Sequence, residues 1–98
     1  DAVGARVRDF DESVALEARQ RLLDVDTTKA ALVASDEAVT AATEARRVLG
    51  ERFRAGVATS TELLDGDVAL LEAELEHTQL QAALRIAEAR LIRTAGGR

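Results

Sequence analysis

The chain has no cysteine, proline, methionine, tryptophan or tyrosine, and its only aromatic residues are Phe10 and Phe53. Without cysteine it can form neither a disulfide framework nor a thiolate metal site. Its single histidine, His77, cannot build a histidine-rich zinc site. A sandwich or barrel would need short β-branched and aromatic strands with frequent turns, and the sequence has no such runs. These absences leave an all-α polypeptide as the expected class.

The charge balance narrows the choice of partners. The chain carries 18 acidic and 13 basic residues, a formal net charge of -5. Nucleic acid is therefore not expected as the main partner, because binding a phosphate backbone needs clustered lysine and arginine. No apolar run approaches the roughly 18 residues that indicate a membrane span.

Helix-forming residues dominate, and alanine alone supplies about a fifth of the 98 residues. With no proline to interrupt a helix, the central glycines predict where the chain reverses. We predict one helical hairpin over residues 1–98, with a helix over about 3–53, a turn over about 54–60 and a helix over about 61–94. Long helices joined by so short a connection should fold back antiparallel, as in a coiled coil.

The turn has residues suited to ending one helix and starting another. Gly56 can adopt the left-handed conformation that closes a helix. Thr59, followed three residues later by Glu62, fits a capping box, although Ser60 or Thr61 could also be the cap.

Two apolar columns run along the second predicted helix, about 150° apart on a helical wheel. The first seam consists of Leu63, Leu70, Ala73, His77, Leu80, Leu84, Ala87 and Leu91. The second seam consists of Leu64, Val68, Leu71, Leu75, Ala82, Ala89 and Ile92. A polar strip of Asp67, Glu74, Gln81 and Glu88 separates them. Two seams favour a helix with a neighbour on each side, as in a curved wall of helices. A helix with one broad apolar face in an ordinary bundle is an equal alternative.

The first predicted helix has a less regular pattern. One seam is approximated by Val7, Val14, Ala18, Val25, Leu32, Val39, Ala42 and Leu49. A weaker second column contains Leu16, Leu23 and Ala30. Near the turn, arginines precede the reversal and acidic residues follow it, so an antiparallel hairpin should bring opposite charges close together. These charged residues are Arg46, Arg47, Arg52, Arg54, Glu62, Asp65 and Asp67.

The segment 51–65 resembles the helical hairpin turn of TolC-like outer membrane efflux proteins. Its pattern is an arginine and an aromatic residue, a glycine three positions on, a small polar residue, and then an acidic residue with a leucine-rich helix start. The matching residues are Arg52, Phe53, Gly56, Thr59, Glu62, Leu63, Leu64 and Asp65. The alanine and leucine spacing downstream and the finish Ala95-Gly96-Gly97 are also similar to this family. The chain departs from it at Gly66, Asp67 and His77.

This resemblance implies a periplasmic tunnel segment of a bacterial outer membrane channel, from the second of two repeats. The intact protein would be a trimer that meets the membrane only through parts outside this chain. It would export small molecules or ions with a periplasmic adaptor and, indirectly, an inner membrane transporter. The resemblance makes Gly56, Val57, Ala58 and Thr59 the adaptor-docking tip. It makes Arg52, Arg54 and Glu62 candidates for polar contacts that hold the tip closed.

In such a tunnel, Asp67, Glu74 and Glu88 could line the lumen and favour cations.

Other functions find less support in the residues. No catalytic constellation is recognisable, and we expect neither an enzyme, a cofactor nor a metal site. His77 lies in a leucine column, which suggests a seam residue with a wet polar edge. The alternatives are the hairpin of a periplasmic adaptor, which should be flanked by lipoyl-like strands, and a generic coiled-coil scaffold or dimerisation element, which needs only one seam.

Overall fold

The fold consists of two α-helices that pack antiparallel, as the sequence predicts. In a computed structural model, which describes residues 2–96, α1 spans Ala2–Arg54 and α2 spans Ser60–Ala95. The observed helices extend one residue further than predicted at each end. Gly97, part of the predicted glycine finish, lies outside the described residues.

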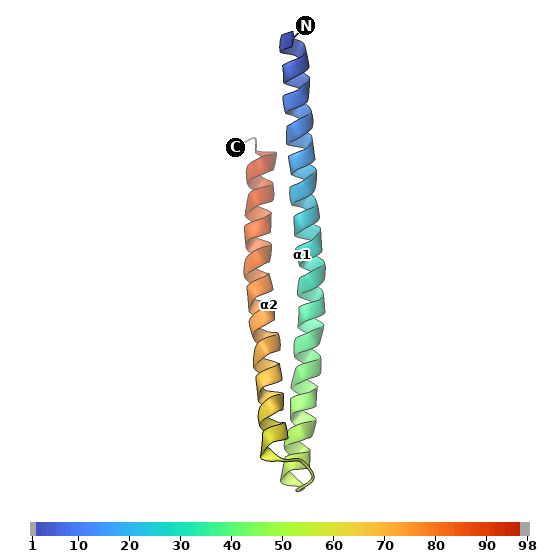
Figure 1. Cartoon of the computed structure of the whole chain (residues 1–98), viewed down its shortest axis with the longest axis vertical. Helices are drawn as coiled ribbons and strands as arrows, with labels where there is room; N and C mark the ends of the chain where they lie inside the picture. The colour runs from blue at the N-terminus through green and yellow to red at the C-terminus, as the bar shows by residue number, and fades with distance from the viewer. Residues whose placement is uncertain (1, 97–98) are drawn as a thin grey trace. The chain divides into compact units, whose positions relative to one another are not determined.

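The chain divides into two units, each containing a piece of both helices. The turn unit is Ala31–Gln81, which holds the end of α1, the turn and the start of α2 (Figure 1, green to orange). The end unit contains the described part of Asp1–Ala30 and Ala82–Arg98. In the turn unit the buried residues include Ser35 and Gly50, and in the end unit they include Val25 and Ala87. The helices therefore meet along a narrow contact and not around a broad core.

The two seams of α2 differ in their exposure to solvent. Every residue of the first seam is buried or half-buried, while every residue of the second seam is exposed. On α1 the predicted seam from Val14 to Leu49 is likewise at least half-buried, whereas Val7 is exposed. The column of Leu16, Leu23 and Ala30 is exposed along its whole length. The hairpin thus covers one seam of each helix and leaves the other in water.

The end of α1 closes with a Schellman motif centred on Gly56. The Gly56 amide donates to the Phe53 carbonyl at 3.0 Å, and the Val57 amide donates to the Arg52 carbonyl at 2.9 Å. Gly56 has a φ of 78°, and it is the only glycine among the described residues with a positive φ. These two bonds satisfy carbonyls that the helix leaves unpaired, and the left-handed residue reverses the chain.

The start of α2 is capped by Thr59, as one of the sequence alternatives predicted. The Thr59 hydroxyl oxygen accepts from the Glu62 amide at 3.1 Å. The Glu62 carboxylate accepts in return from the Thr59 amide at 3.4 Å and from the Thr59 hydroxyl at 3.2 Å. This reciprocal pair is a capping box, and it fixes the first turn of the helix.

A glycine allows the helices to approach closely just beyond the turn. A Cβ atom added at Gly66 of α2 would lie 2.7 Å from Cδ1 of Leu49 on α1. The small residue at this position therefore makes room for the Leu49 side chain, which is half-buried against it. An alanine at this position would require the Leu49 side chain to shift.

Substitutions at Gly56 test whether its left-handed conformation is needed to reverse the chain between α1 and α2. A Cβ atom at this position meets no heavy atom within 4 Å, so a substitution is strained by backbone conformation alone. We expect Gly56→Val to lower the free energy of unfolding by about 1–2 kcal/mol, because left-handed backbone is costly for residues with a Cβ. Gly56→Asn should cost less, because asparagine tolerates this conformation. Thermal unfolding followed by circular dichroism makes the comparison, and equal losses for the two variants would contradict the assignment.

Candidate interaction sites at the turn and along α2

The predicted tip residues lie together in the turn and are largely open to solvent. Gly56, Val57 and Thr59 are exposed, and Ala58 is half-buried. In a Schellman motif the residue after the glycine often packs back on the helix, but Val57 remains 74% exposed. The helix residue opposite Val57 in this motif is Arg52, which is exposed as well. The turn therefore presents a small aliphatic side chain that the hairpin itself does not use.

The three residues proposed for polar tip contacts behave differently from one another. Glu62 uses its carboxylate in the capping box with Thr59. Arg52 and Arg54 are exposed, and within residues 2–96 neither side chain has a hydrogen bond or ion pair. The structure thus leaves two free guanidinium groups beside the turn, available to a neighbouring molecule.

One ion pair links the two helices in the turn unit. The Arg46 guanidinium on α1 donates from Nε to the Asp67 carboxylate on α2, and both side chains are partly exposed. This is the cross-helix pairing of charges that the sequence predicted around the turn. It neutralises Asp67, the first residue of the predicted lumen strip. Glu74 and Glu88 of that strip are exposed, and the described part of the chain gives them no ionic partner.

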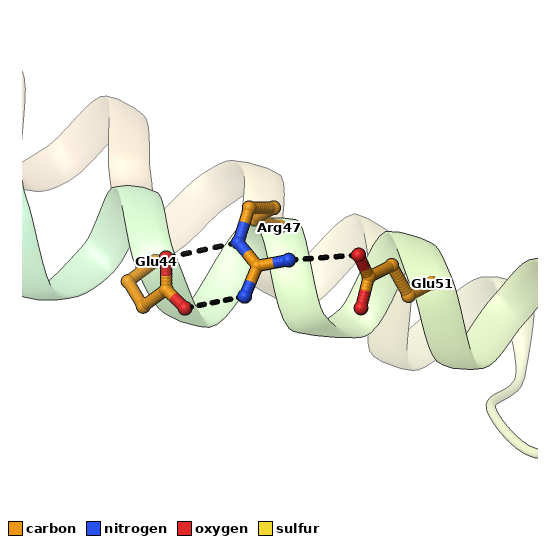
Figure 2. Close-up of polar contacts among 3 residues, drawn as sticks. All are labelled: Glu44, Arg47 and Glu51. Atoms are coloured by element: carbon orange, nitrogen blue, oxygen red, sulfur yellow. Dashed lines mark hydrogen bonds and ion pairs between the residues drawn. The ribbon is translucent and has the colours of Figure 1, made fainter.

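Arg47 pairs within its own helix and not across the hairpin (Figure 2). Its Nε and Nη2 donate to the two carboxylate oxygens of Glu44 at 3.0 and 2.6 Å, and its Nη1 donates to Glu51 at 2.7 Å. The hydrogen bonds and charge of Arg47 lower the pKa of Glu44, and the two carboxylates in turn raise the pKa of Arg47. The arrangement is an exposed network along one face of α1.

A polar contact that sequence patterns did not reveal joins the helices inside the first seam. Ser35 of α1 is buried, and its Oγ donates to the Leu32 carbonyl at 2.8 Å. His77 Nδ1 lies 2.9 Å from the same oxygen. The ring nitrogen and the hydroxyl oxygen are within hydrogen-bond distance, and the tautomer of His77 determines which of them donates. His77 is therefore a seam residue held by α1, which explains a histidine in a leucine column.

Residues 2–96 contain neither a metal-ligating cluster nor a candidate membrane span. In this range no group of three or more histidine, aspartate or glutamate side chains is arranged to hold a metal ion. Neither described helix contains a stretch long and apolar enough to cross a membrane. The candidate sites that the exposed side chains indicate are two surfaces, the turn and the exposed seam of α2.

Comparisons of the chain with models of known protein families, with curated proteins and with solved structures find no match. These comparisons therefore identify no family for the chain.

The Glu44–Arg47 pair gives a pH-dependent prediction. A carboxyl group whose pKa is lowered in the folded protein stabilises the fold above its ordinary pKa of 4.5, and this contribution is lost as pH falls through the lower folded value. In an NMR titration of the side-chain carboxyl, Glu44 should titrate below 4.5. Arg47→Gln should move the midpoint up toward the ordinary value. A midpoint that does not change in the variant would show that Arg47 is not the cause.

The Ser35–His77 contact can be measured with a double-mutant cycle of Ser35→Ala and His77→Leu. His77→Leu alone should be close to neutral, because Ser35 retains the Leu32 carbonyl and leucine continues the seam. The cycle, from urea unfolding, should give a coupling of about 1 kcal/mol, typical of a partly buried hydrogen bond. A coupling indistinguishable from zero would mean that the contact does not stabilise the hairpin.

Proposed function

We propose that the chain is a segment of the periplasmic tunnel of a TolC-like outer membrane efflux channel, in the homotrimeric parent. The observation that carries this proposal is the exposed second seam of α2 beside a packed first seam. A helix of this kind needs a neighbour on each flank, and a wall of helices supplies both. A self-sufficient two-helix scaffold needs only one seam.

The turn supports the proposal from a second direction. Val57 presents an unused apolar side chain next to the exposed backbone of Gly56, and Arg52 and Arg54 present free charges around it. A small apolar centre with a charged rim is the usual anatomy of a protein interface. In the proposed channel this surface docks the periplasmic adaptor, which connects the tunnel to an inner membrane transporter. The hairpin would act mechanically, without catalysis or a cofactor.

The same setting gives a role to the polar strip between the seams. In a wall of helices, the strip between two packed flanks faces the lumen or the outside of the tube. Glu74 and Glu88 are free to act there as fixed negative charges, whereas Arg46 neutralises Asp67. A lumen lined in this way would favour small molecules or ions of positive charge.

Docking at the tip can be tested in the intact parent protein in cells. A photo-crosslinking residue at Val57 should capture the periplasmic adaptor, and one at the exposed Glu37 on α1 should not. Val57→Asp keeps the backbone hydrogen bonds of the turn but places a charge at the apolar centre. We expect it to weaken docking by about 2 kcal/mol, roughly thirtyfold in affinity, and to impair export. Adaptor capture from both positions, or full export by the Val57→Asp variant, would contradict the proposal.

A further inference from the structure

The part of the second seam that lies in the turn unit is a strongly exposed aliphatic surface. Leu64, Leu71 and Leu75 are 61%, 65% and 58% exposed, and Val68 is 45% exposed. Their spacing of four, three and four residues places them in one row on α2. We call this row, with the carboxylates along its edges, the acidic patch. It consists of Leu64, Val68, Leu71 and Leu75 with Asp65, Glu72, Glu74 and Glu76.

The charges that α2 itself carries around this row are all negative. Residues 60–84 contain six carboxylates and no lysine or arginine. Two of the six are already engaged, since Glu62 caps α2 and Asp67 pairs with Arg46. The four carboxylates of the acidic patch have no hydrogen bond or ion pair to any residue that the structure describes. Helix α2 thus offers a hydrophobic row with three unpaired carboxylates along one edge, and with Glu74 unpaired along the other edge, where Asp67 is paired with Arg46.

We propose that the acidic patch is the docking surface for a helix whose aliphatic seam is flanked by arginine or lysine. Covering an aliphatic side chain of this size stabilises a complex, and basic flanks would neutralise carboxylates that now repel one another. Charges at these flanking positions determine which helices pair in coiled coils. An acidic or neutral helix could cover the row but would leave the repulsion in place.

The basic end of α2 in a second copy of this chain matches the patch less well. The exposed basic stretch at the end of α2 carries Arg85, Arg90 and Arg93, but only two large aliphatic side chains, Ile86 and Ile92. Such a partner would leave part of the four-residue row uncovered. The inference rests on the proposed function in one respect: that function makes the basic helix the neighbour of α2 in the tunnel wall. The hydrophobic row and the carboxylates of the acidic patch are features of the turn unit and do not depend on that function.

The test uses the whole chain and two designed helical peptides as probes. Both peptides carry the same leucine seam, and the flanking positions are arginine in one and glutamate in the other. Fluorescence anisotropy at low salt should give an affinity for the arginine peptide at least about tenfold higher than for the glutamate peptide. The preference should shrink in the variant Glu72→Gln/Glu76→Gln.

Variants of the row supply the control for the apolar contact. Leu71→Ser/Leu75→Ser should abolish binding of the arginine peptide. Leu16→Ser/Leu23→Ser removes leucines of similar exposure from α1 and should leave binding unchanged, with circular dichroism confirming the helical fold of each variant.

Three results would overturn the inference: equal affinity for both peptides, no binding of either, or self-association of the chain that Leu71→Ser/Leu75→Ser abolishes. The last would identify a second copy as the occupant. None of these results depends on adaptor capture or export, so failure here is distinguishable from failure of the proposed function.

Discussion

The structure depends on the burial of one apolar seam of α2 against α1. This contact is narrow, and most of its residues are half-buried and not enclosed. Each half-covered leucine contributes only part of the roughly 2 kcal/mol that full burial of such a side chain provides. Accessory contacts therefore matter more than in a globular core. The Ser35–His77 contact, the Arg46–Asp67 pair and the close approach at Gly66 all lie in the turn unit and link its two helices.

The exposed seam follows from the same constraint. A two-helix hairpin has room to cover one flank of each helix, so the second seam stays in water although its residues are equally apolar. Contiguous exposed aliphatic rows of this kind usually mark interaction surfaces. The exposed row therefore indicates packing against a partner, and the tunnel wall that we propose would supply one on the open flank of α2.

Much of the fold could be predicted from the sequence because it is set locally. The helix formers, Gly56 and the Thr59–Glu62 capping box determine the two helices and the reversal within a few residues. The choice of seam could not be predicted, since the two columns of α2 have the same periodicity and similar composition. The Ser35–His77 contact joins residues 42 apart in sequence, so it depends on the register of the hairpin. Likewise, only the three-dimensional arrangement shows that Arg47 pairs with its own helix while Arg46 reaches α2.

Selective cysteine labelling tests most directly whether the second seam is an interface, because the chain has no cysteine of its own. The variant Leu71→Cys places a thiol on the exposed second seam, and Leu70→Cys places one at the adjacent residue, on the packed first seam. In the isolated hairpin, position 71 should react with a maleimide much faster than position 70. In the assembled parent channel, position 71 should become as protected as position 70. If position 71 keeps its full reactivity in the assembly, the second seam has no neighbour and the account is wrong.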